Sequence, residues 1–562
     1  MGDELGQLVP DDEAAAGSVG EQPWWQRSAV YQVYPRSFAD SDGDGVGDLE
    51  GVRQHLDHIA GLGAEALWLS PVFPSPMADF GYDVSDYCDI DPVFGTLEAF
   101  DALVRDAHDR GLRVVLDWVA NHTSEEHPWF ALSRSSRDNP KRDWYVWADP
   151  GPGGGPPNDW TSAFRAVGPA WTLDEHTGQY YLHSFAPQQP DLNWDNPEVE
   201  QALHDTVRFW MDRGVDGLRL DAIIKVAKDP RLRDTGASAV PHHEDWETIH
   251  HRLARLRRVV DEYPDRMLVG ELWARDLPRF VTFLSGTGMH LAHNFELVEL
   301  PWDAAAYRDF IDRFEAEAAS VPGLWPCWFL ENHDLPRVAS RFGGGGRHGA
   351  ATSGTADDLG QARARGILFL IHLLRGTPFV YQGQELGLPD GVVPPEQVVD
   401  VDGRDPERAP IPWERPSVVG AGAGFTTGTP WLPLVEEAEH FCVAAQEDDP
   451  ASTLHLTRTI AALRRATPAL TGGSQVTVDA GADVLGWVRE GAGERYLALV
   501  SFAAAQCRPS LGPDLPEEGD VVLRTSPEWA VGHHEEAGSP VRLAELVLQP
   551  GEGVLVRLPA TG

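Results

Sequence analysis

Cysteine is scarce in this chain. Only four of its 562 residues are cysteines, namely Cys88, Cys327, Cys442 and Cys507. They are too widely separated for a zinc site and too few for a disulfide scaffold. Three of them lie in apolar or strand-like surroundings, so we expect all four to be ordinary reduced thiols. The scarcity excludes a fold that is held together by disulfides.

Basic residues are also few. Lys and Arg together number 45 against 87 Asp and Glu, which gives a formal net charge of −42 at pH 7. A surface of this sign repels nucleic acid and anionic membranes, so we expect neither as a partner. A neutral small-molecule ligand is compatible with this charge. Salt tolerance and plain solubility would also account for it, and the sequence does not decide between them.

Long hydrophobic runs are absent as well. No stretch of about 18 uninterrupted apolar residues occurs, so the sequence predicts no membrane-spanning helix. The first residues, MGDELGQLVPDDEAAAGSVGEQ, are acidic and lack the basic region and apolar region of a secretion signal. We therefore expect residues 1–22 to be a mobile tail and the protein to be cytoplasmic.

The chain does contain a regular alternation of apolar strands with amphipathic, helix-like stretches, which is typical of a parallel α/β sheet. Eight candidate strands can close a barrel: VYQVY (30–34), EALWLS (65–70), RVVLD (113–117), VDGLRL (215–220), MLVGE (267–271), HLAHNF (290–295), CWFLE (327–331) and TPFVYQ (377–382). The sequence thus predicts a (β/α)8 TIM barrel over residues 23–120 and 191–474.

Three further segments depart from this alternation. Residues 121–190 are too long for a plain loop and predict a small domain inserted after the third strand, over the barrel mouth. Residues 475–562 contain short alternating strands such as QVTVDA and GVLVRLP, which predict a C-terminal antiparallel β-sandwich domain. The glycine-rich stretch 343–358 follows the seventh strand, and we expect a mobile loop there that gates a pocket.

Three acidic residues each follow a short apolar run. Asp221 follows VDGLRL, Glu271 follows MLVG, and Asp334 ends PCWFLENHD. This pattern places the carboxylates at the C-terminal mouth of the predicted barrel, where barrel enzymes carry their chemistry. Two carboxylates that flank a sugar bond suffice for glycoside hydrolysis, and a third can stabilise the cation. Acidic residues after strands also cap helices, so position alone does not decide between the two interpretations.

The neighbours of these carboxylates favour chemistry. Arg219 lies two residues before Asp221 and so points to the same side of the strand, where it can keep a nucleophilic carboxylate ionised. An Asn-His pair precedes Asp334, and another ends DWVANH (117–122). Neutral His122 and His333 can donate to sugar hydroxyls without adding charge near a developing cation. A lone histidine of this kind is more often structural, but two beside carboxylates favour a binding role.

Taken together, the motifs resemble glycoside hydrolase family 13, the α-amylase family, over about residues 24 to 560. They occur in one order along the chain: ALWLSP (66–71), DWVANH (117–122), QPDLNW (189–194), GLRLDA (217–222), GEL (270–272), NHD (332–334) and YQGQELG (381–387). Longer stretches resemble the exo-acting α-glucosidase and oligo-1,6-glucosidase branch: WWQRSAVYQVYPRSF (24–38), SPMADFGYDVSDY (75–87) and AGFTTGTPWLP (423–433).

The resemblance implies a retaining exo-α-glucosidase. In this family Asp221 would be the nucleophile, Glu271 the acid/base and Asp334 the transition-state stabiliser. The substrate-binding residues it implies are Asp79, Tyr82, His122, Gln189, Arg219, His333 and Arg408. Asp79 and Arg408 would clamp the non-reducing glucose, with Arg404 as the competing arginine, and Tyr82 would stack on the sugar face.

A calcium site is expected in DSDGDGVGD (40–48). Asp40, Asp42 and Asp44 alternate before Gly45, as in the opening of an EF-hand loop, but Gly51 stands where that loop needs Glu. The resemblance implies a structural Ca²⁺ with two further ligands, the carboxylate of Asp48 and the carbonyl of Val46. The alternative is a plain acidic turn.

Linkage preference depends, by the resemblance, on the residue after the nucleophile. Relatives that favour α-1,6 bonds carry valine there, whereas this chain has Ala222. We therefore expect α-1,4 bonds in short, maltose-like α-glucosides to be preferred, with some transglucosylation. Alternatives within the family are an oligo-1,6-glucosidase and an isomerase of the trehalose synthase or sucrose isomerase type. An inactive scaffold that chaperones membrane transporters is disfavoured by the three carboxylates, and a monomer or a dimer stays open.

Overall fold

The computed structural model describes residues 22–236, 242–343, 357–532 and 540–560. The predicted tail, residues 1–22, lies outside the described residues except for Gln22. The predicted gating loop, residues 343–358, lies outside them except for its first residue and its last two.

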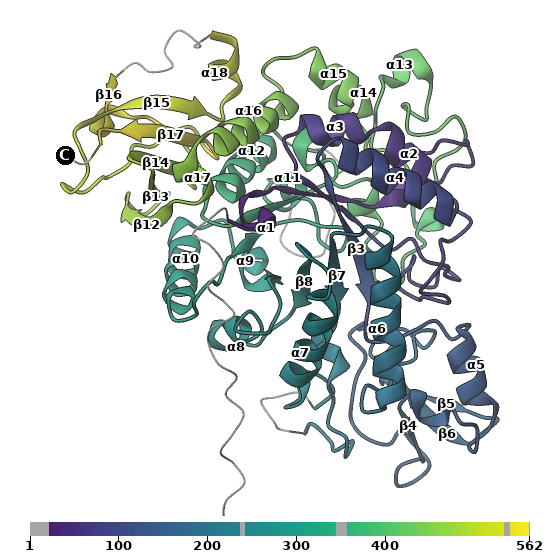
Figure 1. Cartoon of the computed structure of the whole chain (residues 1–562). Coiled ribbons are helices and arrows are strands. Elements are labelled where there is room, and N and C mark those ends of the chain that lie inside the picture. The colour runs from purple at the N-terminus through teal and green to yellow at the C-terminus, as the bar shows by residue number, and fades with distance from the viewer. Residues whose placement is uncertain (1–21, 237–241, 344–356, 533–539, 561–562) are drawn as a thin grey trace, which may run out of the picture.

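Eight parallel strands form the centre of the molecule (Figure 1). They are β1 (Val30–Val33), β2 (Ala66–Leu69), β3 (Arg113–Val119), β7 (Gly217–Asp221), β8 (Met267–Leu272), β9 (Leu291–Asn294), β10 (Cys327–Trp328) and β11 (Thr377–Tyr381). The pairing order is β10-β11-β1-β2-β3-β7-β8-β9, and β9 and β10 also lie side by side, so the sheet closes on itself. The predicted TIM barrel is confirmed.

The strands form because their apolar residues are buried on both faces of the sheet. In β2, Trp68 points into the barrel, where it joins Val115 and Val269 in an inner core. Its neighbours Leu67 and Leu69 point outward into a larger core that is shared with the helices. This alternation follows from the two-residue period of a strand.

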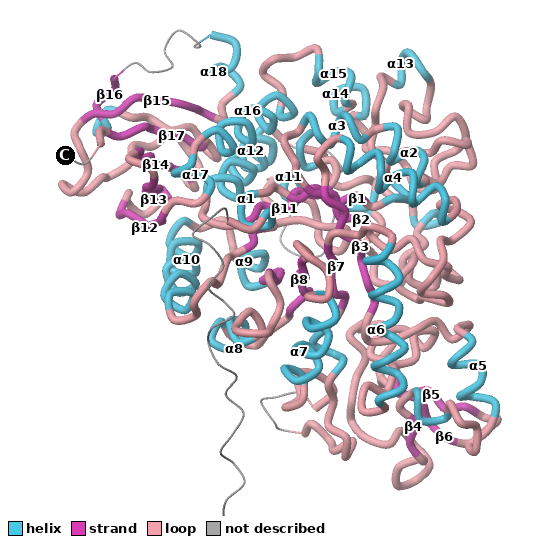
Figure 2. Tube along the Cα trace, in the orientation of Figure 1, coloured by secondary structure: helices cyan, strands magenta, loops and turns pink. Residues whose placement is uncertain are grey.

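Helices cover the outside of the barrel, as Figure 2 shows. The main ones are α2 (Leu49–Gln54), α3 (Leu56–Gly61), α4 (Leu97–Asp109), α6 (Pro197–Asp212), α7 (Ile249–Val260), α8 (Leu277–Thr282), α10 (Ala304–Ala319), α12 (Asp358–Leu373) and α16 (Thr453–Ala466). Side chains satisfy free N–H groups where several begin: Thr96 accepts from Ala99 at α4, and Asn196 accepts from Glu198 at α6. No helix of the described residues is both long and apolar enough to cross a membrane.

Shorter elements fill the loops around the barrel. The short helices are α1 (Trp24–Arg27), α5 (Pro128–Ser135), α9 (Phe295–Glu299), α11 (Val338–Arg341), α13 (Pro416–Val419), α14 (Ala438–Phe441), α15 (Val443–Glu447), α17 (Pro468–Thr471) and α18 (Pro527–Gly532). The 3-10 turns are η1 (Pro35–Ser37), η2 (Arg142–Trp144), η3 (Ile223–Val226), η4 (Gln384–Leu386), η5 (Pro395–Gln397), η6 (Pro406–Arg408) and η7 (Leu543–Glu545).

Between β3 and α6 the chain forms a small sheet of its own. Its strands are β4 (Trp147–Ala148), β5 (Trp171–Asp174) and β6 (Gln179–Leu182), in the order β4-β6-β5. A separate core supports it, in which the rings of Trp160 and Trp171 stack with centroids 6.0 Å apart. This sheet lies within the segment predicted as an insertion.

The C-terminal part is an antiparallel sheet, as the sequence predicted. Its strands are β12 (Ser474–Asp479), β13 (Val484–Gly491), β14 (Glu494–Ser501), β15 (Glu518–Arg524), β16 (Pro540–Arg542) and β17 (Gly553–Leu558). Pairing joins all six in one sheet, in the order β12-β13-β14-β17-β15-β16.

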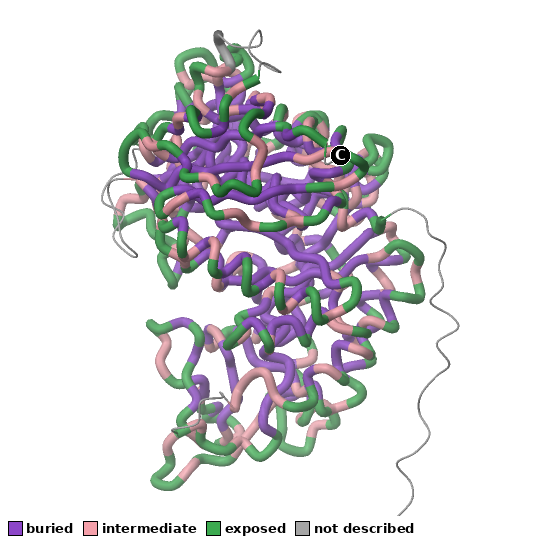
Figure 3. Tube along the Cα trace, turned by 90° about the vertical axis from the view of Figure 1, so that its left-hand side faces the viewer, coloured by how far each residue is buried: buried purple, intermediate pink, exposed green. Residues whose placement is uncertain are grey.

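The C-terminal sheet packs tightly on the barrel helices. Gly366 of α12 makes this possible, because a Cβ there would meet the Gly551 carbonyl oxygen at 2.2 Å. Trp487 of β13 donates its indole N–H to the Leu373 carbonyl at the end of α12, 3.2 Å away. Buried residues therefore run without a break from the barrel into this sheet (Figure 3).

Candidate active site

The three predicted catalytic carboxylates lie at one rim of the barrel. Asp221 ends β7, Glu271 is the fifth residue of β8, and Asp334 follows β10 in the loop. Because the strands are parallel, their carboxyl ends meet at the same mouth. All three side chains line one cavity of about 330 Å³.

Arg219, buried in β7 beneath the cavity, bonds to two of these carboxylates. Its Nη1 lies 2.7 Å from Asp221 Oδ1, and its Nη2 lies 2.9 Å from Glu271 Oε2. Nη1 also lies 3.0 Å from Oδ1 of Asp117, which is a third buried acid on β3. One guanidinium, itself only 1% exposed, therefore fixes three carboxylates relative to one another.

The acids around Arg219 carry more negative charge than it can balance. Burial raises the pKa of Asp117 to about 6, although Arg219 lowers it. Burial, together with the charges of Glu271 and Asp117, also raises the pKa of Asp221 against the effect of Arg219. Such a set favours anything positive that enters it, either a proton or a sugar cation.

Around Asp334, by contrast, the positively charged side chains outweigh the negative charge. Arg404 Nη1 lies 2.9 Å and Arg408 Nη2 lies 3.0 Å from its Oδ1, and His333 Nε2 lies 3.1 Å from its Oδ2. Burial raises the pKa of Asp334, but these neighbours outweigh it and hold that pKa well below its ordinary range. Asp334 is thus ionised at neutral pH.

The arginine that reaches the cavity is Arg404, not Arg408. Arg404 lines the cavity, and its Nη2 lies 2.6 Å from Asp79 Oδ1. Arg408 is 1% exposed and lies behind Asp334, where its Nε donates to the His333 carbonyl at 2.8 Å. The cavity lining thus favours the competing Arg404 as the sugar clamp, and the choice of Arg408 stays a prediction.

Asp400 explains why both arginines can be buried so close together. Arg404 Nε lies 3.0 Å from Asp400 Oδ2, and Arg408 Nη1 lies 3.4 Å from Asp400 Oδ1. With Asp79 and Asp334, this gives three carboxylates for two guanidinium groups. Pairing of this kind offsets the desolvation free energy that burial of these charges costs.

Three other residues that were predicted to bind the sugar also lie beneath the residues that line the cavity. Gln189 and His333 are fully buried and Arg219 is nearly so, and none of them lines the cavity. Gln189 donates from Nε2 to Asp79 Oδ2 at 2.9 Å, so it orients the residue that does line the cavity. Their direct contact with the sugar stays a prediction, and in this structure they support the residues that line the cavity.

A chain of hydrogen bonds fixes the tautomer of His333. Gln32 donates from Nε2 to His333 Nδ1 at 2.8 Å, so the proton of the neutral ring is on Nε2. That nitrogen lies 2.6 Å from the hydroxyl of Tyr82, which in turn donates to Asp117 Oδ2 at 3.1 Å. Burial lowers the pKa of His333 to about 3, so the ring adds no charge.

Asp79, Tyr82 and His122, which were predicted to bind the sugar, line the cavity. Ala222 lines it as well, and its amide donates to Glu271 Oε2 at 3.1 Å. The φ angle of Ala222 is 43°, in the left-handed region that a residue with a Cβ rarely adopts.

Several cavity residues were not predicted from the sequence. They are Ala163, Phe164, Phe185, Ile224, Lys225, Glu244, Trp273, Phe295, Leu335 and Asp402. Trp273 could have been found, because it stands two residues after Glu271 and strand alternation turns both the same way. Its ring stacks on Phe295 with centroids 3.8 Å apart. Phe164 and Phe185 come from the inserted segment, where no periodic pattern marks them.

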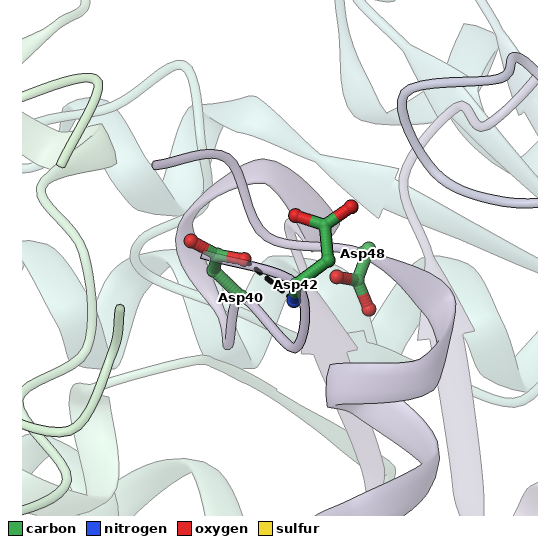
Figure 4. Close-up of side chains that lie close together, drawn as sticks. All are labelled: Asp40, Asp42 and Asp48. Carbon is green, nitrogen blue, oxygen red and sulfur yellow. Dashed lines mark hydrogen bonds between the residues drawn. The ribbon is translucent and has the colours of Figure 1, made fainter. Parts of the chain in front are cut away.

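The acidic loop of residues 40–48 gathers three of its predicted ligands. Carboxylate oxygens of Asp40, Asp42 and Asp48 lie within 4.8 Å of one another (Figure 4). This donor set, made of hard oxygens, fits Ca²⁺. Asp44 is not part of the group, and its carboxylate accepts from the Val46 amide at 2.7 Å. Two Asp40 oxygens already accept from loop amides, so the loop also holds its shape by itself.

Comparison with known proteins agrees with this geometry. The family model of the alpha amylase catalytic domain matches residues 32–473. A probable alpha-glucosidase of Rhizobium meliloti is 42% identical over 514 residues, which cover 86% of this chain and 90% of the relative. An oligo-1,6-glucosidase of Parageobacillus thermoglucosidasius is 36% identical and covers 79% of this chain and 84% of its own length.

Solved structures give the same result. The alpha-glucosyl transfer enzyme XgtA superposes with a TM-score of 0.82 at 39% identity, which covers 96% of this chain and all of that one. The family model covers more than half of the chain, and both relatives exceed 30% identity over more than two thirds of it. The chain therefore belongs to the α-amylase family, glycoside hydrolase family 13, and is an enzyme of its exo-acting glucosidase branch.

Proposed function

We propose that this protein is a retaining exo-α-glucosidase that releases glucose from the non-reducing ends of short α-glucosides. The observation that carries the proposal is the Arg404 cluster. Asp79, Arg404 and Asp334 join across one end of the cavity through contacts of 2.6 and 2.9 Å. A closed end of this kind accepts one terminal sugar and leaves no room for a chain to pass through.

The mechanism uses the two carboxylates that Arg219 links. Glu271 protonates the leaving oxygen while Asp221 attacks the anomeric carbon, which gives a covalent β-glucosyl enzyme. Glu271 then takes a proton from water, which releases glucose with its configuration retained. Two carboxylates bound to one guanidinium favour the separation of about 5 to 5.5 Å that retention needs. The surplus negative charge around Arg219 stabilises the oxocarbenium-like transition state.

The test of the mechanism is azide rescue of Asp221→Ala. The variant should fold but not turn over, and with an activated α-glucoside and azide it should form β-glucosyl azide, because the small anion occupies the vacated space. Glu271→Gln should instead slow poor leaving groups far more than good ones. Formation of the α-azide, or undiminished activity, would contradict the role of Asp221.

We infer a preference for α-1,4 bonds from the small side chain of Ala222 at the cavity wall. The rival activities are glucosyl transfer to a second sugar, as the name of XgtA indicates for that enzyme, isomerisation and α-1,6 hydrolysis. All share the first half-reaction, so the catalytic carboxylates do not separate them. Products from maltose, isomaltose, sucrose, trehalose and starch would separate them.

We also propose a structural Ca²⁺ held by Asp40, Asp42 and Asp48, with Asp44 and the Val46 carbonyl as the predicted further ligands. The clustering of the three carboxylates supports it. A ligand bound only by the folded state stabilises that state, so chelation should lower the melting temperature. If chelator and Asp42→Ala both leave melting unchanged, the loop is only a turn.

A cytoplasmic location stays a prediction from the sequence, as does the choice between a monomer and a dimer. Cell fractionation would test the first and sedimentation the second. The proposed partner is a small saccharide.

A further inference from the structure

A buried ion pair lines the cavity outside the catalytic groups. Lys225, in η3 after β7, bonds through Nζ to Glu244 Oε2. Both side chains line the cavity, with 11% and 20% of their surfaces exposed. Neither is needed for the mechanism proposed above.

The pair lies across the cavity from the closed end. Arg404 follows β11 and Lys225 follows β7, and four strand positions separate β11 from β7 in the barrel order β10-β11-β1-β2-β3-β7-β8-β9. In an eight-stranded barrel, these two strands stand on opposite sides. Ala222, which touches Glu271, is only three residues before Lys225. The pair therefore lies on the side from which the aglycone leaves.

Backbone and side-chain contacts hold the pair in position. The amide of Asp245 donates to the Ile224 carbonyl at 2.9 Å, so the segments that carry Glu244 and Lys225 are bonded to each other. The carboxylate of Asp245 forms an ion pair with Arg279 of α8. Lys228 Nζ donates to the Lys225 carbonyl at 2.5 Å. A pair fixed at this many points presents a donor and an acceptor in a set geometry.

The charges around the pair disfavour an anion. The cavity wall carries six acids, Asp79, Asp221, Glu244, Glu271, Asp334 and Asp402, against two basic groups, Arg404 and Lys225. Glu244 is ionised, because burial raises its pKa but Lys225 and its cationic neighbours together lower it further. His243 adds no positive charge, since burial and Lys225 lower its pKa to about 4. The charge of Lys225 is thus balanced by Glu244 and does not attract an anionic ligand.

We propose that Lys225 and Glu244 are specificity-determining residues for the aglycone, which select a neutral hydroxyl-bearing aglycone and reject an anionic one. Lys225 donates to one aglycone hydroxyl and Glu244 accepts from another. A phosphate or carboxylate on the aglycone meets the negative charge of Glu244 instead. The inference rests on the proposed glucosidase function and names its substrate class.

The test compares two aryl substrates that differ only in charge, 4-carboxyphenyl and 4-carbamoylphenyl α-glucoside. The wild-type enzyme should favour the carbamoyl substrate, and Glu244→Gln should reduce that preference in kcat/KM about tenfold, because one repelling charge is removed. Lys225→Met should increase the preference, since it removes the compensating charge. Glu247→Gln is the matched control: it removes one charge from the same loop at an exposed position outside the cavity wall.

A second ratio tests the hydroxyl contacts. For Glu244→Gln and Lys225→Met, kcat/KM for maltose should fall about tenfold relative to p-nitrophenyl α-glucoside, whose aglycone bears no hydroxyl. Melting temperatures verify that each variant is folded. If both substrate ratios of Glu244→Gln and Lys225→Met matched those of Glu247→Gln, this inference would be overturned and the proposed function would stand. A wild-type enzyme inactive on every α-glucoside would overturn the proposed function and this inference with it.

Discussion

The two ends of the cavity are built differently. At the closed end, Arg404 is bound by Asp79, Asp334 and Asp400, and Arg408 supports the same carboxylates from behind. At the open end, Lys225 pairs with Glu244, and the rings of Trp273 and Phe295 stack on each other. At the closed end each charge has several partners, so this network is rigid and suits the one glucose unit that all substrates share. A single ion pair beside the aglycone can change without loss of the chemistry.

The largest effect is expected from the closed end. Arg404→Met keeps an unbranched stem but leaves Asp79 without a cation, and it leaves Asp334 and Asp400 paired with Arg408 alone. Loss of Arg404 removes a sugar contact and also releases Asp79, which positions the same glucose. We therefore expect kcat/KM to fall by about a thousandfold, and by a similar factor for maltose, isomaltose and p-nitrophenyl α-glucoside.

Arg415→Met serves as the control for this variant, because it removes an arginine whose partner, Asp448, is 78% exposed. Its kinetics should match those of the wild type. If Arg404→Met affected only one of the three substrates, the closed end would not be the common glucose site. The proposed difference between a shared glucose site and a variable aglycone site would then be contradicted.

A second prediction concerns Glu331, which lies behind the closed end and is 3% exposed. Burial raises its pKa from 4.5 to about 7, against the effect of Arg337. The folded state then binds the proton more tightly than the unfolded state does. This stabilisation is complete below about pH 4.5 and is lost as pH rises through 7, by about 3 kcal/mol in all.

Glu331→Gln should remove this dependence. The amide keeps an oxygen for the Val338 N–H and never ionises. The melting temperature of the variant, relative to wild type, should therefore rise between pH 5 and pH 8. Glu396→Gln, at an exposed position, should show no such change. A constant difference across this range would mean that Glu331 stays ionised beside Arg337.

The sequence predicted the parts of the site that follow from strand period and position. Asp221, Glu271 and Asp334 could be found because each follows an apolar run that ends at the barrel mouth, and Arg219 because residues two apart share a face. The eight strands could be found for the same reason.

The layer around these residues could not be predicted in the same way. Arg404 and Arg408 occupy one irregular loop, and the choice between them depends on how Asp400 and η6 turn the chain. Lys225 and Glu244 are brought together by a backbone hydrogen bond within the long connection between β7 and α7. Irregular backbone has no period from which a direction could be inferred.

The smallest expected effect lies where the two ends meet, at Ala222. Ala222→Val adds two methyl groups beside the scissile bond, which typically costs about 1 to 3 kcal/mol in a packed site. The more extended α-1,6 linkage should suffer less than the α-1,4 linkage, so the ratio of maltose to isomaltose kcat/KM should fall about tenfold. A branched side chain at a φ of 43° also strains the backbone, but that strain slows both substrates and cancels in the ratio. Ala222→Ser, which adds no branch, should keep the wild-type ratio. An unchanged ratio in Ala222→Val would place linkage choice in the aromatic wall instead, and Trp273→Ala would then be the variant that shifts it.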